Sequence, residues 1–395
     1  MNRPLSHVKV LDLTHMLAGP YATMLMADLG AEVIKIEPQT GEVTRNLLSK
    51  DKDFSLDGVG AYHLTLSRNK KSLLLDLKKS EGKELFYDLV KKADVVVNNF
   101  SQGVTERLEI THDDLIKINP KIITCDITGF GQTEQNRPAY DAIVQAYGGG
   151  MSITGFDVDK PVRSGIPHGD IGAGLFAVIG VLSALQSRQE NQKGSHVDIS
   201  MLDCQVSMLN YMSTMYFLSG KNPEPIGNEH FVHFPYDSYK TKDGSIMIGV
   251  VAEGFWPNLI EAVNDEYLKS EEFLTLQGRL EKRKNIDKIL RDFFGKLSNS
   301  EAIDLLQEKR VPCAPINKFS DAFEDPDLLK RNMIVDVTQK SGKSVKMPGN
   351  PVKISNMQEN FDPAPELGEH SEEVLKSWLD LDEEAIKNLK SKDVI

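Results

Sequence analysis

A single aspartate, Asp170, has the sequence surroundings that a covalent carboxylate nucleophile needs. It lies in the segment GIPHGDIGAG, residues 165–174, directly before the apolar stretch 175–185. Glycines on both sides let a substrate approach closely, and a position at the start of a helix helps a carboxylate stay ionised. The segment therefore predicts a carboxylate that attacks an electrophile. The alternative is an ordinary N-cap, in which Asp170 accepts hydrogen bonds from the first free N–H groups of the helix.

The composition is that of a globular protein with a large core, and it argues against two classes of partner. The chain has 395 residues, 58 of them acidic and 46 basic, and a net charge of -12. Such a charge repels nucleic acid and anionic lipid unless a local basic patch intervenes, so we expect neither as a partner. The length is enough for about two or three domains.

The cysteines and the apolar segments indicate a compartment. Cys125, Cys204 and Cys313 are far apart and form no CxxC pair, which argues against a disulfide framework or a zinc site and predicts thiols in a reducing compartment. Residues 1–7 lack the charged start and apolar run of a signal peptide, and the longest apolar helix candidate, 173–185, is shorter than the roughly 20 residues that cross a bilayer. We expect a soluble, cytoplasmic protein with no bound metal.

Short β-branched runs alternate with amphipathic segments in the first half of the chain. This rhythm is typical of a parallel sheet with crossover helices and predicts a Rossmann-like α/β core. The predicted strands are 8–13, 32–37, 72–76, 95–98, 122–127 and 197–201, and the predicted helices are 21–29, 81–92, one from the Asp170 segment towards Arg188, and 204–218. A nicotinamide cofactor is not supported, because GFG at 129–131 is followed by QTE and completes no GxGxxG motif.

The pattern changes near Ser219. Residues 220–235 are rich in proline and glycine, and a strand pair, 236–241 and 245–251, is predicted on either side of an Asp-Gly turn. Charged helical segments follow over 255–307. These segments predict a second, smaller α+β domain. Two acidic helices, 371–379 and 383–391, end the chain.

Seven sequence segments, in order, carry a resemblance that covers nearly the whole chain. They are VLDL (10–13) with AGP (18–20), DLGAEVIKIE (28–37), RNKKS (68–72) with LDLK (75–78), ADVVVNNF (93–100), GFGQT (129–133), the Asp170 segment and LGEH (367–370). With these segments the chain resembles the family III CoA-transferases, a group that includes formyl-CoA:oxalate, carnitine-related and succinyl-CoA:dicarboxylate CoA-transferases. The resemblance implies an enzyme that moves CoA from an acyl-CoA thioester to a small free carboxylic acid.

In that family the aspartate that matches Asp170 is the covalent nucleophile. The resemblance implies that Asp170 attacks the thioester carbonyl to form a mixed anhydride and release CoA thiolate, which returns to give an aspartyl-CoA thioester. Water must be excluded, because it hydrolyses the anhydride. Backbone N–H groups near Gly169, Gly172 and Gly174 are candidates for stabilising the oxyanion. Tyr140 matches a family tyrosine near the nucleophile, and its alternative role is that of a packed aromatic residue.

The resemblance implies CoA as a substrate and no permanently bound cofactor. It places the binding residues at the ends of successive parallel strands, where such folds bind ligands. Lys78 and Arg107 can meet phosphates, although without the resemblance they are ordinary surface charges and Asn99 an ordinary turn residue. The implied CoA-binding residues are His15, Met16, Leu17, Ala18, Leu75, Lys78, Asn99, Phe100, Ser101 and Arg107.

The resemblance also implies an interlocked homodimer, in which two subunits are threaded through one another. A large Rossmann-like CoA-binding domain, 1–205, leads through a linker, 206–235, to the small α+β domain, 236–330. A return linker and the C-terminal helices, 331–395, complete the large domain. Each active site is expected between the large domain of one subunit and the small domain of the other.

Departures from the family bear on the substrate. Leu17 stands where the oxalate-specific enzyme has a glutamine, and Pro38 stands where it has an arginine. The glycine-rich loop that shields the intermediate of that enzyme has no counterpart around 220–235. GNEH (227–230) and PY (235–236) resemble the succinyl- and dicarboxyl-CoA branch instead, so we expect a dicarboxylic substrate.

Three other functions remain open at this point. An α-methylacyl-CoA racemase shares the fold and uses an aspartate and a histidine as bases. Tyr140 stands at the position of that histidine, and tyrosine, with a pKa of about 10, is a poor base, although His168 could replace it. A non-catalytic CoA-binding protein does not need an intact Asp170 segment. A nicotinamide-dependent dehydrogenase lacks its glycine motif.

Overall fold

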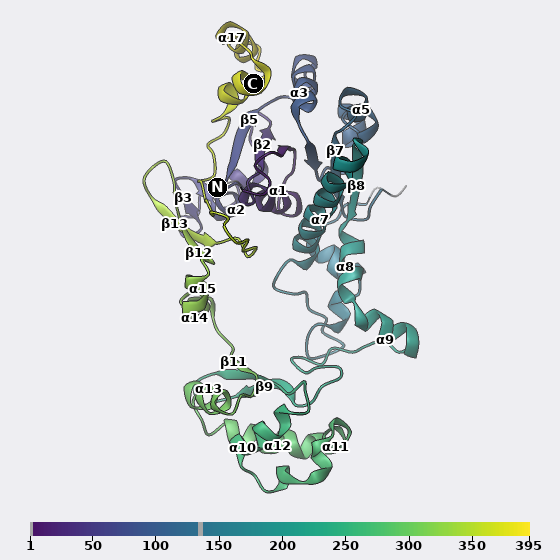
Figure 1. Ribbon diagram of the computed structural model, residues 1–395, viewed down its shortest axis with the longest axis vertical. Coiled ribbons are helices and arrows are strands. Elements are labelled where there is room, and N and C mark those ends of the chain that lie inside the picture. The colour runs from purple at the N-terminus through teal and green to yellow at the C-terminus, as the bar shows by residue number, and fades with distance from the viewer. Residues whose placement is uncertain (1–2, 133–136) are drawn as a thin grey trace. The chain divides into compact units, whose positions relative to one another are not determined.

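Residues 3–132 and 137–395 are described by a computed structural model (Figure 1). The chain divides into two compact units. The first consists of Met1–Met151, Arg163–Asn222 and Asp327–Ile395, and the second of Ser152–Val162 and Pro223–Pro326.

These boundaries differ from those predicted at 205, 235 and 330. Ser152–Val162 joins the second unit because it contacts the segment that follows Pro223. The backbone N–H of Gly227 donates to the carbonyl of Gly155 at 2.7 Å. A Cβ on Gly227 would lie 2.4 Å from the ring of Phe156, so this contact leaves no room for a side chain.

The first unit is built on a six-stranded sheet in which every neighbouring pair is parallel. In spatial order the strands are β5 (Lys70–Leu74), β2 (Glu32–Glu37), β1 (Lys9–Asp12), β6 (Val95–Asn98), β7 (Ile123–Thr128) and β8 (Ser195–Ser200). The predicted parallel α/β core is confirmed. Strand order reverses between β1 and β6, and open sheets of this kind bind ligands beyond the carboxyl ends of the strands at such a reversal.

Helices cover both faces of this sheet, because successive side chains of a strand point to opposite faces. Val95 and Val97 of β6 pack in one buried cluster, and Val96 packs in another. The helices of the first cluster include α1 (Ala18–Asp28) and α7 (His168–Asn191), and those of the second include α3 (Ser80–Lys92), α16 (Ser371–Leu379) and α17 (Glu383–Ser391). The C-terminal helices therefore complete the core of the first unit.

The helix that carries Asp170 is longer than predicted. α7 has 24 residues, and Asp170 follows the N-cap Pro167 at the third helical position, so the N-cap interpretation is wrong. By length and composition α7 could cross a membrane, contrary to the expectation from 173–185, but half of its most apolar part is buried within the protein. A Cβ on Gly174 would lie 2.8 Å from the carbonyl oxygen of Ala18, so this glycine allows α7 to approach α1 closely.

The predicted helix 204–218 is in fact two helices, α8 (Met201–Leu209) and α9 (Tyr211–Ser219). Asn210 separates them with φ 50° and ψ −126°. Its side-chain oxygen accepts the N–H of Tyr211 at 2.7 Å. This conformation lies outside the helical regions, so one continuous helix cannot run through Asn210.

The second unit is a small α+β structure, as predicted. An antiparallel sheet of β11 (Cys313–Pro315), β10 (Ser245–Gly249) and β9 (Tyr236–Lys240) packs with α10 (Phe255–Val263), α12 (Arg283–Phe294) and α13 (Asn299–Glu308). Trp256, Tyr239 and Phe294 are buried at its centre. The short helix α11 (Leu276–Glu281) lies between α10 and α12 in the chain.

A hairpin of β12 (Ile334–Thr338) and β13 (Ser344–Pro348) lies in the segment predicted as a return linker. Val335 and Val337 of β12 pack against Leu64, so this segment has its own small core in the first unit. The other elements that the next sections use are α2 (Ala61–Leu66), α4 (Val104–Leu108) and α6 (Asp141–Tyr147).

Candidate active site

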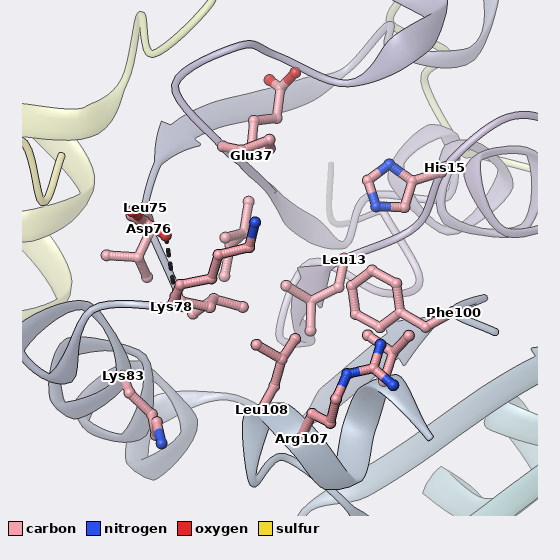
Figure 2. A pocket seen from close by; sticks show the side chains of 14 residues that line it. Leu13, His15, Glu37, Leu75, Asp76, Lys78, Lys83, Phe100, Arg107 and Leu108 are labelled. Carbon is pink, nitrogen blue, oxygen red and sulfur yellow. Dashed lines mark hydrogen bonds between the residues drawn. The ribbon is translucent and has the colours of Figure 1, made fainter. Parts of the chain in front are cut away.

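Two adjoining cavities lie in the first unit beyond the carboxyl ends of β1 and β6. We call the one of about 460 Å³ the apolar cavity (Figure 2) and the one of about 390 Å³ the Asp170 cavity. His15 and Phe100 line both. Because His15 follows β1 and Phe100 follows β6, both cavities occur where the strand order reverses.

The apolar cavity combines hydrophobic walls with positively charged side chains. Its apolar lining includes Leu13, Ile36, Leu75, Phe100 and Leu108, and its basic lining consists of Lys78, Lys83 and Arg107. Lys83, from α3, forms an ion pair with Glu109. Lys78 and Arg107 are exposed, and within the described chain neither is paired with a carboxylate. The cavity can therefore hold an apolar ring next to anionic groups.

Hydrogen bonds from distant residues hold the loop that separates the two cavities. The side-chain oxygen of Asn99 accepts the N–H of His15 at 2.7 Å, and its side-chain nitrogen donates to the carbonyl of His15 at 2.7 Å. Asn99 is thus a clamp on this loop as well as a lining residue. Met16, the next residue, has φ 63°, a left-handed conformation that is strained for a residue with a side chain.

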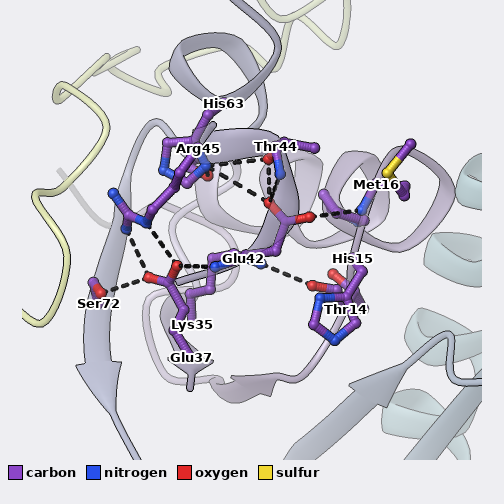
Figure 3. Close-up of polar contacts among 12 residues, drawn as sticks. Thr14, His15, Met16, Lys35, Glu37, Glu42, Thr44, Arg45, His63 and Ser72 are labelled. Carbon is purple, nitrogen blue, oxygen red and sulfur yellow. Dashed lines mark hydrogen bonds and ion pairs between the residues drawn. The ribbon is translucent and has the colours of Figure 1, made fainter. Parts of the chain in front are cut away.

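Buried charges hold the same loop on another side (Figure 3). An oxygen of Glu42 accepts the N–H of Met16 at 3.0 Å, and Nζ of Lys35 donates to the carbonyl of Thr14 at 2.8 Å. Glu42 and Lys35 are each 1% exposed. Burial alone would raise the pKa of Glu42, but the nearby ring of His63, the charge of Lys35 and the hydrogen bonds from Thr44 and Met16 outweigh it and hold that pKa at about 2. Glu42 therefore stays ionised at neutral pH.

Asp170 lines the Asp170 cavity with its carboxylate half-buried. No residue that the structure describes donates a hydrogen bond to this carboxylate. Burial, and then the negative charge of Asp141, raise the pKa of Asp170 from 3.8 to about 6. A helix start by itself favours a lowered pKa, so the expected direction of the shift is opposite to the one that burial and Asp141 produce.

Asp141, the first residue of α6, positions the start of α7. One of its oxygens accepts the N–H of Gly169 at 2.8 Å, and the other accepts a hydrogen bond from Gln145 at 2.7 Å. The side-chain oxygen of Gln145 in turn accepts the N–H of Ser164 at 2.9 Å. The N–H of Gly169 is therefore not free to stabilise an oxyanion, contrary to the prediction.

Gly172 does not line the Asp170 cavity either. A Cβ there would lie 2.6 Å from the terminal methyl of Met208, so the absence of a side chain serves packing between α7 and α8. Tyr140 does line the cavity and is 69% exposed, so it does not pack in the core of its own chain. His168, the residue considered as a second base, is not in the lining of this cavity.

Every predicted CoA-binding residue lines one of the two cavities. Leu75, Lys78 and Arg107 line the apolar cavity, Met16, Leu17, Ala18, Asn99 and Ser101 line the Asp170 cavity, and His15 and Phe100 line both. Sequence reasoning missed Tyr62 of α2, whose pKa is raised by burial and then by the charges of Asp170 and Asp141. It also missed Phe130, which belongs to the GFGQT segment, and Arg137, which belongs to none of the quoted segments; both lie in the loop after β7.

No group of three or more metal-ligating side chains occurs among the residues that the structure describes. The site as it stands therefore consists of one carboxylate in a cavity, a charged clamp on the loop beside it, and an adjoining cavity with basic groups.

Comparisons with known proteins show the family of this chain. The family model "CoA-transferase family III" matches residues 5–371. The succinyl-CoA:mesaconate CoA-transferase of Haloarcula hispanica is 36% identical over 94% of this chain and 95% of its own. The succinyl-CoA:glutarate CoA-transferase of Homo sapiens is 33% identical over 100% of this chain and 90% of its own.

A solved structure shares the fold. The crystal structure of a CAIB/BAIF family protein from Brucella suis is 33% identical and has a TM-score of 0.85 over 96% of this chain and 100% of its own. The family match spans most of the chain and includes the strands, the clamped loop and Asp170. This chain is a CoA-transferase and belongs to CoA-transferase family III.

Proposed function

We propose that this enzyme transfers CoA between small dicarboxylic acids through a covalent intermediate on Asp170. The observation that carries the proposal is the half-buried carboxylate of Asp170, which has no hydrogen-bond donor in the described chain and faces a cavity that adjoins a second one with basic groups. Two relatives named for mesaconate and glutarate, each with succinyl-CoA, support a dicarboxylic donor and acceptor.

The two cavities divide the acyl-CoA between them. The apolar cavity suits the adenine ring against Leu75 and Phe100, with Lys78 and Arg107 close enough to its edge to bind phosphates. The pantetheine arm then passes the shared wall at His15 and delivers the thioester to Asp170. CoA is a substrate in this scheme, and no residue of the scheme requires a resident cofactor.

The proposed reaction has four steps. A carboxylate oxygen of Asp170 attacks the thioester carbonyl, the C–S bond breaks, and CoA leaves as thiolate, which forms a mixed anhydride. The thiolate attacks the Asp170 carbonyl of that anhydride, expels the donor acid as its carboxylate, and leaves an aspartyl-CoA thioester. The acceptor carboxylate attacks this thioester and again expels thiolate. The thiolate then attacks the acceptor carbonyl and restores Asp170, so no proton or electron is consumed.

The environment of Asp170 suits this chemistry. With a pKa of about 6 the carboxylate is ionised at neutral pH, and it is a stronger nucleophile than an ordinary aspartate with a pKa of 3.8. No hydrogen bond from the residues that the structure describes has to break before it attacks. Tyr140, exposed at the cavity, is the side chain we assign to hydrogen bonding of the developing oxyanion.

We also propose that the enzyme is an interlocked homodimer in the cytoplasm, with neither nucleic acid nor membrane as a partner. Phe217 and Leu218 of α9 are 78% and 84% exposed, and a group of exposed large apolar side chains supports a protein interface there. The three cysteines are unpaired, which is consistent with a reducing compartment. The net charge of -12 disfavours binding to anionic polymers and lipids.

The proposal is tested by mass spectrometry of the CoA esters formed from succinyl-CoA and a panel of free acids that includes glutarate, mesaconate, oxalate and monocarboxylates. We expect a new CoA ester from at least one dicarboxylate, and none with Asp170→Ala. Exchange with monocarboxylates alone would contradict the dicarboxylic substrate. Solvent deuterium in the α-position of a 2-methylacyl-CoA, without any transfer, would replace the proposal by racemisation.

A further inference from the structure

Arg137 is the basic side chain that shares a cavity with the nucleophile. Of the described residues that line the Asp170 cavity, Arg137 alone is a lysine or an arginine. The other basic side chains considered above, Lys78, Lys83 and Arg107, line the apolar cavity. Positive charge is thus divided between the two cavities, and because the proposed function places the phosphates of CoA at the apolar cavity, they leave Arg137 without a role.

Two aromatic rings hold the guanidinium of Arg137. Its central carbon lies 4.1 Å from the ring centroid of Phe130 and 5.2 Å from that of Tyr147. The two rings themselves pack edge to face, with centroids 5.7 Å apart. Stacking involves the faces of a guanidinium and leaves the N–H groups on its edges available. The guanidinium is therefore oriented and can still donate hydrogen bonds.

The positive charge of Arg137 is not paired with a negative charge within the described chain. None of the described carboxylates forms an ion pair with it, and none of the described groups accepts a hydrogen bond from it. The Asp170 cavity contains the carboxylate of Asp170, and Asp141 lies close enough to raise the pKa of that group. A second carboxylate on a substrate is therefore repelled in this cavity unless a fixed cation receives it.

We propose that Arg137 binds the non-reacting carboxylate of a dicarboxylic substrate and thereby sets the enzyme's preference for dicarboxylic over monocarboxylic acids. This inference rests on the proposed function. The planar guanidinium matches a carboxylate with two parallel hydrogen bonds, and its place on Phe130 and Tyr147 fixes the direction from which the substrate is held. The reacting end of the same substrate then faces Asp170.

The test compares acids that differ in one charge. Transfer from acetyl-CoA, a donor without a free carboxylate, is measured with glutarate and with glutaramate, its monoamide, for the wild type, Arg137→Gln and Arg137→Lys. We expect Arg137→Gln to lower kcat/KM for glutarate by about 10- to 100-fold and to leave kcat/KM for glutaramate within about twofold. For Arg137→Lys we expect a kcat/KM for glutarate between those of the wild type and Arg137→Gln, because lysine keeps the charge and lacks the planar guanidinium.

Arg331 is an exposed arginine of the same unit, so Arg331→Gln is the matched control for the loss of one charge. It should change kcat/KM for neither acid. An equal loss for glutarate and glutaramate, together with a raised KM for acetyl-CoA, would overturn the inference and assign Arg137 to the CoA moiety. Unchanged kinetics in Arg137→Gln would overturn it as well. A wild type that forms no CoA ester from any acid, even with succinyl-CoA as the donor, would instead refute the proposed function, so the two failures are distinguishable.

Discussion

At the scale of single residues, Asp170 is held in a state that favours reaction over stability. Its carboxylate is half-buried and receives no hydrogen bond within the described chain, and burial and then Asp141 raise its pKa to about 6. The backbone around it is fixed all the same, because Asp141 binds the N–H of Gly169. A nucleophile that is positioned through its neighbours can keep both of its oxygens free.

The raised pKa predicts a pH profile. The reaction needs ionised Asp170, so kcat/KM should fall about tenfold per pH unit below about 6. Asp141→Asn removes the like charge and should move this midpoint to lower pH, although burial, the larger cause, keeps it above 3.8. Asp88→Asn on the surface of α3 carries the same charge change and serves as the control. An unmoved midpoint in Asp141→Asn would contradict the electrostatic account.

The same pKa predicts a stability effect. Folding raises the pKa of this carboxyl from 3.8 to about 6, so the ionised form is disfavoured in the folded state by about 3 kcal/mol. This cost is absent below pH 3.8, grows between pH 3.8 and about 6, and is complete above that range. Asp170→Asn should therefore raise the free energy of unfolding at pH 7.5 by up to about 3 kcal/mol and leave it unchanged near pH 3.5. Denaturant titrations at both pH values measure this, and equal effects at both would count against it.

At the scale of elements, the site depends on how the loop after β1 is held. Asn99 clamps His15 from one side, and Glu42 and Lys35 hold Met16 and Thr14 from the other (Figure 3). These contacts fix a strained conformation at Met16, whose φ is 63°. The loop forms a wall of both cavities, so its conformation affects the binding of the whole acyl-CoA.

Glu42 is expected to act as a positioning residue through Met16. Glu42→Ala removes the acceptor of the Met16 N–H and should raise the KM for acyl-CoA about tenfold, with a smaller effect on kcat. Met16→Gly in the same chain should recover part of that loss, because glycine adopts positive φ without strain. Steady-state kinetics on the single and double variants, with melting curves to monitor folding, provide the measurement. Failure of the second substitution to restore KM would show that Glu42 supports stability alone.

At the scale of the whole molecule, the proposed assembly is an interlocked homodimer. The family resemblance implies two interlocked subunits, and exposed apolar side chains on α9 support an interface there. Interlocked subunits separate only after unfolding, so the dimer should persist at nanomolar concentration in analytical ultracentrifugation. Phe217→Asp or Leu218→Asp should lower the yield of dimer. A monomer that retains full activity at that dilution would contradict both the dimer and a shared active site.

Sequence periodicity was sufficient for much of the fold. β2, β6, α16 and α17 have the predicted bounds because their apolar patterns and flanking residues are unambiguous. The break at Asn210 was missed, since an asparagine within a helical pattern gives little local signal. The hairpin over 334–348 was missed too, although the alternation of Val335 and Val337 could have indicated it.

Only those residues of the candidate site that match motifs of the family could be predicted from the sequence. Asp170, Tyr140 and the CoA-binding positions came from the resemblance, and they line the two cavities. Tyr62, Asp141 and Arg137 depend on contacts between segments that are distant in the chain, or on the absence of a partner, which periodicity and motifs do not contain. For the same reason the use of the Gly169 N–H by Asp141 could be found only from the structure.

The measurement that tests the central claim most directly is mass spectrometry of the protein after acid quenching with succinyl-CoA and no acceptor acid. The account predicts an adduct with the mass of CoA less one water on the peptide that contains residues 165–174, located at Asp170 and absent in Asp170→Ala. Transfer without this adduct, or the same adduct at another residue, would contradict a covalent mechanism on Asp170.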